Sequence, residues 1–359
     1  MIPELTEYAR ARATFLTTSG DAGAQQASHV HPLRGPGDEE LATDTARFGA
    51  PIGEAHTVVL ISSGLHGVEG HAGSGLQELL LASGRTGSLP PGVALVLVHA
   101  VNPYGFAWSR RVDHTNVDVN RNFVDYADLP ENPRYAELDP ILNPVELDPA
   151  DESFLGELLA FWAEVGDEVA FRTLSGGQYS HPDGVQFGGQ EATWSRRTME
   201  RIWEEHLVGA ETAIALDVHT GLGPLGRLTV FQTADADEPS AALGTTLFPE
   251  HIYRSDRSGS IDHGLLGVGF DEWGAGRVAT STFVVEFGTY DPMHGLTVFR
   301  NDNWLHRHGD PRSELGEQIR SGMRDFFFVA EHGWRRDVAD AGLEAIHRTL
   351  DAVSADEHR

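Results

Sequence analysis

Four apolar runs along the chain have the length of buried β-strands. They cover Thr57–Gly64, Val93–Pro103, Ala213–Gly221 and Ser281–Tyr290. Between the first two runs, "SGLQELLLASG" has helical spacing and ends in glycine. A strand, loop, helix and strand in this order form a βαβ unit, which is typical of parallel sheets covered by helices. We therefore predict an α/β fold with a mixed, mostly parallel central sheet flanked by helices.

Helical spacing also marks both ends of the chain. Glu4–Leu16 is predicted as an amphipathic helix, followed by a polar loop, "TTSGDAGAQQ". Two more helices are expected near Ser313–Glu331 and Asp337–Val353.

The middle of the chain lacks this regularity, and we predict a loop excursion over residues 125–190. Residues 130–149 are rich in proline and acidic side chains, and residues 174–190 are rich in glycine and aperiodic, as expected of a functional loop or cover. Repeats and long linkers are absent from the sequence, so residues 1–359 are predicted to form a single domain.

Composition narrows the chemistry that the chain can perform. Its 54 acidic and 26 basic residues give a net charge of -28, which disfavours nucleic acid as a partner. All basic residues are arginine and cysteine is absent, which excludes a lysine Schiff base, disulfides and thiolate ligands. Catalysis would therefore depend on histidine, carboxylates, hydroxyl groups or a metal.

Neither a signal-peptide core nor a stretch of roughly 18 apolar residues is present in the sequence. We therefore expect a cytoplasmic protein without a membrane partner. The oligomeric state stays open, an oligomer included.

Polar residues at the ends of three predicted strands suggest a metal site. His66 and Glu69 form H-x-x-E after the first strand, and His219 lies near the end of the third. Ligands collect at the carboxyl ends of strands in open α/β sheets, and two histidines with one glutamate are typical of catalytic Zn²⁺. Asp217 shares a strand face with His219 and could orient it, although an ordinary strand-end cap is the alternative.

Glycines surround His66 in "ISSGLHGVEGHAGSG". Gly64, Gly67 and Gly70 are expected to let the backbone turn and approach a metal and substrate closely.

Glu286 lies in the apolar run "TFVVEFGTY", where a carboxylate is unusual. An apolar setting tunes the pKa of a general base, so Glu286 is the candidate for that role, with a structural ion pair as the alternative.

Arginines cluster in "WSRRVDHTNVDVNRNF". Arg121, with Asn120 beside it, offers a planar cationic fork and an amide donor that suit a substrate carboxylate. Arg110 or Arg111 could place a cation against an oxyanion. Taken alone, "RR" could equally be a solvated face, and "NRN" a turn.

The ordered set of H-x-x-E, N-R-N-F, a strand-end histidine and a strand-end glutamate resembles the zinc carboxypeptidase superfamily, which includes succinylglutamate desuccinylases and aspartoacylases. "GLHGVEG", "VNPYGFAWSRRV", "DVNRNF" and "DVHTGLGP" place the chain closest to an uncharacterised bacterial branch. The resemblance spans Thr57–Tyr290 and implies a three-layer sandwich around the sheet.

The resemblance also implies roles for individual residues. Zinc would be bound by His66, Glu69 and His219, with Glu286 as the general base. The substrate carboxylate would be held by Asn120 and Arg121, and the oxyanion by Arg111 or Arg110. The superfamily brings a tyrosine over the substrate, and Tyr253 is the only one between His219 and Glu286.

Three functions follow as hypotheses. The first is a zinc-dependent hydrolase that cleaves an amide or peptide bond next to a free carboxylate, acting on a small peptide. The second is an N-acyl amino acid deacylase with the same metal site, and the third is a metal-binding module without turnover. A serine hydrolase is poorly supported, because "HAGSG" has Ala72 where a nucleophile elbow requires glycine. The substrate stays open.

Overall fold

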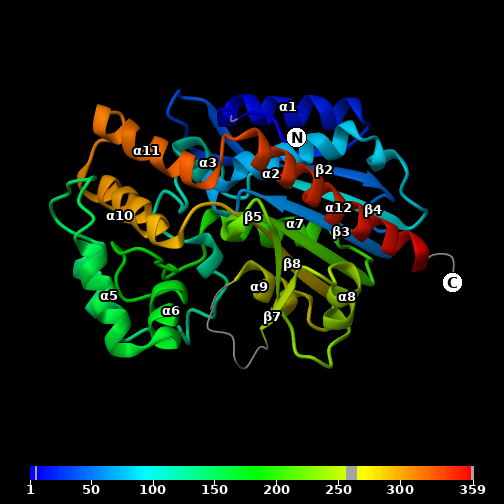
Figure 1. Cartoon of the computed structure of the whole chain (residues 1–359). Coiled ribbons are helices and arrows are strands. Elements are labelled where there is room, and N and C mark those ends of the chain that lie inside the picture. Colours follow the sequence, from blue (N-terminus) through cyan, green and yellow to red (C-terminus); the bar gives the residue numbers. More distant parts are fainter. Residues whose placement is uncertain (5, 256–264, 357–359) are drawn as a thin grey trace.

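An eight-stranded sheet forms the centre of the protein in the computed structural model, which describes residues 1–4, 6–255 and 265–356 (Figure 1). The strand order is β1-β2-β4-β3-β5-β8-β6-β7. The four central strands β4, β3, β5 and β8 run parallel, whereas β2 and β6 pair antiparallel with this central group. The strands are β1 (Gln25–Arg34), β2 (Glu40–Gly49), β3 (Thr57–Ser63), β4 (Val93–His99), β5 (Thr212–Leu225), β6 (Leu228–Thr233), β7 (Ile252–Ser255) and β8 (Ala279–Gly288).

Helices cover both faces of this sheet. Side chains alternate along β3, so that Val59 and Ile61 face one apolar cluster while Val58 and Leu60 face another. The first cluster includes residues of α1, α2 and α12, and the second includes residues of α7 and α9. The predicted α/β fold is confirmed, with three layers (Figure 1).

The helices are α1 (Tyr8–Asp21), α2 (Gly70–Ala82), α3 (Pro103–Trp108), α4 (Tyr135–Leu142), α5 (Phe154–Val165), α6 (Asp167–Ser175), α7 (Trp194–His206), α8 (Pro239–Leu247), α9 (Leu266–Gly274), α10 (Pro292–His308), α11 (Glu314–Phe327) and α12 (His332–Asp356). The described residues also form three short 3₁₀ helices, η1 (Gly67–Glu69), η2 (Arg85–Gly87) and η3 (Val119–Arg121). Within the described ranges, none of the helices is long and apolar enough to cross a membrane.

The N-terminal region differs most from the sequence pattern. α1 starts later than expected and continues to Asp21, and the strands β1 and β2 follow it. β1 is an exposed edge strand, and β2 buries polar residues that apolar periodicity does not detect. The Asp44 carboxylate of β2 is compensated by Arg12 of α1, whose Nε lies 2.7 Å from Oδ2. A buried charge is tolerated when it is paired in this way.

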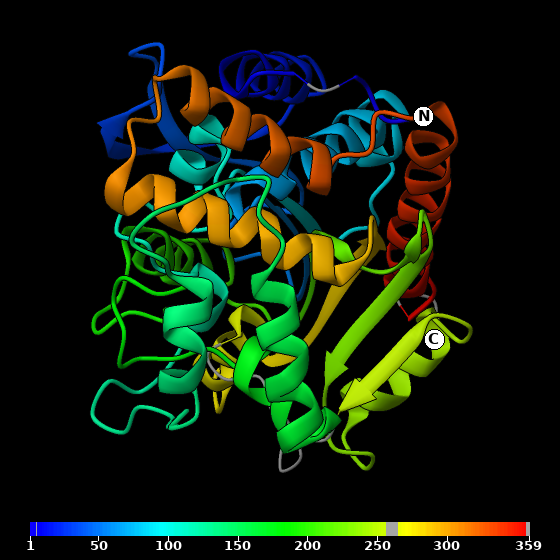
Figure 2. The same ribbon diagram turned by 60° about the vertical axis from the view of Figure 1, so that its left-hand side comes forward.

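Residues 125–190, expected as a loop excursion, contain the three helices α4, α5 and α6. These helices share an apolar cluster that includes Leu138, Leu158 and Phe161, and Met293 and Leu296 of α10 pack against it. Figure 1 shows α5 and α6 below α10 and to the left of the sheet, and Figure 2 shows them from their own side of the molecule. The segment is thus joined to the rest of the chain by apolar contacts with α10 and by hydrogen bonds such as those from Arg121 to the carbonyl of Ser175.

Candidate active site

The site lies where β3, β5 and β8 run side by side. Beyond β3 the chain turns at Gly64, whose φ of +67° lies in the left-handed region that favours glycine, and enters η1 with His66 and Glu69 at its ends. On β5, His219 is directly opposite Glu286 of the parallel strand β8. Three adjacent strands therefore deliver four polar side chains to one edge of the sheet.

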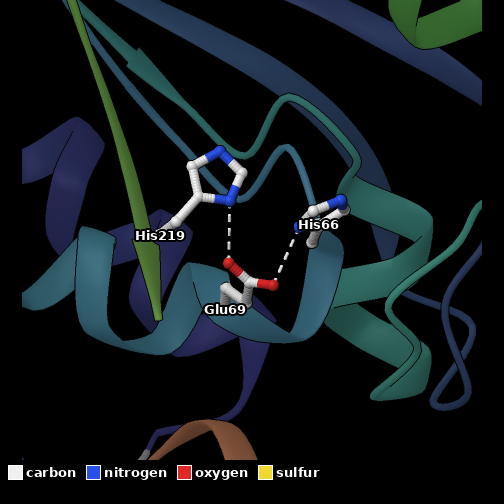
Figure 3. Close-up of side chains that lie close together, drawn as sticks. All are labelled: His66, Glu69 and His219. Carbon is white, nitrogen blue, oxygen red and sulfur yellow. Dashed lines mark hydrogen bonds and ion pairs between the residues drawn. The ribbon is translucent and has the colours of Figure 1, made fainter. Parts of the chain in front are cut away.

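His66, Glu69 and His219 converge on one point, as Figure 3 shows. The Nδ1 atom of His66 lies 2.8 Å from Oε1 of Glu69, and the Nδ1 atom of His219 lies 2.9 Å from Oε2. One ligand atom from each residue lies within 4.8 Å of the other two, and all three side chains are buried. The structure thus brings together the three residues predicted as metal ligands.

The outer nitrogens of both histidines contact carboxylates. The Nε2 atom of His219 lies 2.7 Å from Asp217 Oδ2, and the Nε2 atom of His66 lies 3.0 Å from Asp118 Oδ1. A carboxylate on the far nitrogen fixes the ring and directs the near nitrogen toward a metal, as in known zinc sites. Strand periodicity indicated Asp217. Asp118 was missed, although it stands inside "DVNRNF", because its spacing alone does not point to His66.

The charged groups of this cluster shift one another's pKa values. Burial would raise the pKa of Glu69, but the two histidines outweigh it and lower that pKa to about 2. Burial would likewise lower the pKa of His219, but Asp217 and Glu69 hold it well above its usual value. Asp118 keeps a pKa well below the usual range because Arg111 and His66 outweigh its burial. A dense network of paired charges is therefore maintained in a buried site.

Glu286 lies in the same cavity as the cluster, with 6% of its surface exposed. Its Oε1 atom accepts a hydrogen bond of 2.9 Å from the backbone N–H of Leu222. Burial, together with the negative charge of Glu69, raises the pKa of Glu286 to about 8. The structural ion pair considered as the alternative is not seen, since no salt bridge of Glu286 occurs among the described residues.

The two neighbouring arginines have separate environments. Arg111 lines the cavity beside His66 and Glu286, and its guanidinium contacts Asp118 and Gln186. Arg110 is buried elsewhere, with Nε and Nη2 bonded to Asp302 at 3.0–3.2 Å. The sequence allowed either arginine to face the oxyanion, and of the two the structure brings only Arg111 to the cluster. Arg110 forms a buried ion pair with Asp302, and its guanidinium also contacts Asp113, Asn116 and His306, so it points away from the cluster.

Asn120 and Arg121 also line the cavity. Arg121 is held from the side of α6, since its Nε and Nη2 atoms donate to the carbonyl of Ser175 at 3.0 and 2.7 Å. Asn120 accepts a hydrogen bond of 2.9 Å from the N–H of Leu266. Tyr253 on β7 is 60% exposed and reaches the same cavity at its outer end.

Two of the glycines around His66 lie in close contact with α3. A Cβ atom at Gly67 would lie 2.3 Å from the Cα of Gly105, and one at Gly70 would lie 2.7 Å from Phe106 Cδ1. These two glycines let η1 pack against α3. Of the three glycines, only Gly64 has a positive φ, at the turn after β3.

Two cavities meet at the cluster. The larger, of about 470 Å³, is called the polar chamber here because Asn120, Gln232 and Asp271 line it, although its wall also includes apolar side chains such as Phe231 and Val284. The apolar chamber, of about 220 Å³, is lined mainly by aromatic and aliphatic side chains of α5, α6, α10 and α11. Both are bordered by His66, Arg111, Arg121, Phe171, Leu222 and Glu286. A substrate that occupies both chambers must therefore pass the cluster.

Solved structures share this architecture. Bovine thrombin-activatable fibrinolysis inhibitor, solved in complex with tick carboxypeptidase inhibitor, aligns over 98% of both chains with a TM-score of 0.55 and 9% identity. Carboxypeptidase A from Helicoverpa armigera aligns over 88% of this chain and 74% of its own, with a TM-score of 0.46 and 11% identity. A succinylglutamate desuccinylase from Silicibacter sp. TM1040 aligns over 80% and 67%, at 0.41 and 14%. The chain thus shares the fold of the first of these structures, which agrees with the three-layer sandwich that the sequence resemblance implied.

Within that fold, the sequence model of the family described as "Protein of unknown function (DUF2817)" matches residues 5–341. The chain therefore belongs to this family. No curated protein is significantly similar to it.

Proposed function

We propose that the protein is a zinc-dependent hydrolase that cleaves an amide or peptide bond next to a free carboxylate. The observation that supports this most is the buried convergence of two histidine nitrogens and one glutamate, each histidine backed by an aspartate. Such a donor set fits Zn²⁺, because two histidines and one carboxylate leave a coordination position open. Zinc bound there would supply Lewis acidity toward a substrate carbonyl and a lower pKa for water.

Glu286 would act as the general base. Its carboxylate lines the cavity beside His66 and His219, and the N–H of Leu222 orients it. Since the charge of Glu69 helps to raise the pKa of Glu286, compensation of that charge by a cation would bring this pKa down toward neutrality. Glu286 would then take a proton from the attacking water and pass it to the leaving amine.

Two arginines would bind the developing and the permanent negative charges. Arg111, steadied by Asp118 and Gln186, would donate to the oxyanion. Arg121 and Asn120 would hold the substrate carboxylate in the polar chamber. The presence of Glu286 at the cluster favours turnover over a metal-binding module, which would need no general base.

The test combines metal analysis with one pair of variants. The purified protein should hold about one zinc per chain, and a screen of dipeptides and N-acyl amino acids should reveal its turnover. Glu286→Gln should keep zinc and lose roughly 10²–10⁴-fold in kcat, because the amide preserves shape but cannot accept a proton. Glu272→Gln is the matched control, because Glu272 is exposed on α9 and should change nothing.

A protein without zinc, or a Glu286→Gln variant that retains the wild-type rate, would refute the assignment. A loss of rate that Glu272→Gln shares would point to general destabilisation.

A further inference from the structure

The apolar chamber differs from the polar chamber in its chemistry. Among the described residues that line it and not the polar chamber, there is no arginine, and Glu69 of the cluster is the only carboxylate. Trp162 of α5, Leu174 of α6, and Met293 and Leu296 of α10 form part of its wall. Arg111 and Arg121 line both chambers, so the cations that border the apolar chamber lie where it meets the polar chamber, and a charged group deeper in the apolar chamber would find no counter-ion among the residues that line it alone.

Its size also suits an apolar ligand. A buried cavity of about 150 Å³ lined by Leu, Ile and Phe is known to bind benzene, and the apolar chamber is larger, at about 220 Å³. Phe299, Phe326 and Phe327 add aromatic surface from α10 and α11. Burial of apolar groups against such a wall is favourable in proportion to the area removed from water.

The two chambers define the direction of a bound substrate. If Arg121 and Asn120 hold the carboxylate of the leaving amino acid in the polar chamber, the bond to be cleaved lies at the junction, beside Glu286 and Arg111. The remaining part of the molecule, the acyl group, must then extend into the apolar chamber.

We propose that the apolar chamber is an acyl-binding site and that the substrates are N-acyl amino acids with a hydrophobic acyl group. This inference rests on the proposed function and specifies its substrate class. Hydrolysis would add water across the amide, so that the acyl carbon gains a hydroxyl as the C–N bond breaks and the amine leaves with a proton. Short acyl groups would leave the chamber unfilled, and acyl groups that end in a carboxylate would bring a charge into it.

An acyl series tests the proposal without any change to the chamber. N-acetyl, N-butanoyl, N-hexanoyl and N-octanoyl derivatives of one amino acid are titrated by calorimetry into zinc-loaded Glu286→Gln protein, which holds them uncleaved. Affinity should rise about fourfold for each added methylene until the chamber is filled. The kcat/KM values of the wild type should follow the same order, and N-succinyl derivatives should rank below N-butanoyl ones.

A pair of identical substitutions locates the effect. Leu296→Trp, made in the Glu286→Gln protein, narrows the chamber and should reduce the gain per methylene to less than about twofold. Leu159→Trp is the control, because Leu159 is 57% exposed on α5 and lines neither chamber. Circular dichroism and zinc content should match in all three proteins.

The outcomes separate this proposal from the one on which it rests. Equal binding and cleavage of acetyl and octanoyl compounds would overturn the acyl site and leave the hydrolase standing. A gain per methylene that survives Leu296→Trp would place the acyl group elsewhere. Failure to bind or cleave any member of the series, while dipeptides are cleaved, would overturn the acyl site alone, and failure with every amide would overturn both.

Discussion

The two parts of the site have different origins. The polar cluster comes from three neighbouring parallel strands and the turn beyond one of them, and consists of His66, Glu69, His219 and Glu286. The wall of the apolar chamber comes instead from the helices α5, α6, α10 and α11. The first group, here called the strand half, is fixed by backbone pairing: β3 pairs with β5 over residues 57–63, and β5 pairs with β8 over residues 212–221 without a register shift. The second group, the helical half, is held by side-chain packing between segments far apart in sequence. The sheet thus positions the clustered polar residues, whereas the helices form the apolar wall beside them, which in our proposal would select the substrate.

The packing of the helical half also depends on polar contacts over long separations. Asn303 of α10 donates to Asn143 at 2.7 Å, and the indole N–H of Trp304 donates to the carbonyl of Val145 at 3.0 Å. These bonds join α10 to the loop after α4. Walls built by such contacts can change without disturbing hydrogen bonds of the sheet, so they are suited to variation in specificity.

The largest expected effect is on zinc content, which a substitution in the strand half should abolish and one in the helical half should leave unchanged. His219→Ala should lose zinc and all measurable turnover, because one of three protein ligands is removed. Phe171→Ala, in the helical half and 46% exposed, should keep zinc at the wild-type level. Metal analysis of both proteins, with circular dichroism to confirm folding, makes the comparison. Zinc retained in His219→Ala would mean that His219 is not a ligand of the metal.

The next effect concerns stability of the metal-free strand half. The pKa of Glu286 is raised to about 8 by burial and Glu69, from 4.5 in the unfolded chain, so the native state keeps a proton that the unfolded state has lost. This stabilisation is complete below about pH 4.5 and disappears as the pH rises through about 8.

Chelator-treated wild type should therefore lose roughly 2–4 kcal/mol more than Glu286→Gln between pH 5 and 8, since one pKa unit corresponds to about 1.4 kcal/mol. Denaturant unfolding at both pH values measures this difference. Because the pKa of His219 is also raised, the stability that its protonated form contributes declines in the upper part of this pH range, and this decline is expected in both proteins. Equal pH dependence of the two would show that Glu286 is ionised in the folded, metal-free protein.

A smaller effect is expected one contact further from the cluster. Asp118→Asn keeps a hydrogen-bonding side chain beside His66 but removes the charge that fixes its ring. Zinc affinity should fall by about 10–100-fold. Competition with a chelator of known affinity measures it. Unchanged affinity would restrict Asp118 to holding Arg111, in which case only kcat should decline.

The two halves also differ in how far sequence could predict them. Apolar runs that are continuous and end in polar residues are visible without any knowledge of contacts, so the four central strands, the three clustered residues and Glu286 were placed correctly near one another. The pattern does not predict the edge strand β1 or its neighbour β2, because β1 is exposed and β2 buries paired charges such as Asp44.

The helical half was predicted as loop for a related reason. α4 contains Pro140, and the acidic residues around it obscure a pattern whose apolar members, such as Leu138 and Leu142, are buried only by contact with other helices. The choice between Arg110 and Arg111 was likewise beyond sequence, because it depends on Asp302, 192 positions away. Local pattern thus identifies residues with a chemical role, while long-range packing decides which of them face the site.

Arg121 joins the two halves, and the smallest effect tests its role. It lies in η3 beside the cluster, yet its guanidinium is oriented by the Ser175 carbonyl at the end of α6. Arg121→Lys keeps the charge but removes the planar fork, which should weaken both this anchor and any two-pronged contact with a substrate carboxylate.

A double-mutant cycle distinguishes these two contributions. The kcat/KM values of wild type and Arg121→Lys are measured with a free and an amidated substrate carboxylate. Loss of the anchor alone slows both substrates equally, whereas direct contact makes amidation far more harmful to the wild type than to the variant. The coupling free energy should be on the order of 1 to 2 kcal/mol if the groups touch. Effects that add within about 0.5 kcal/mol would make Arg121 a positioning residue that ties the helical half to the cluster, and recognition of the carboxylate would then have to come from another group lining the polar chamber.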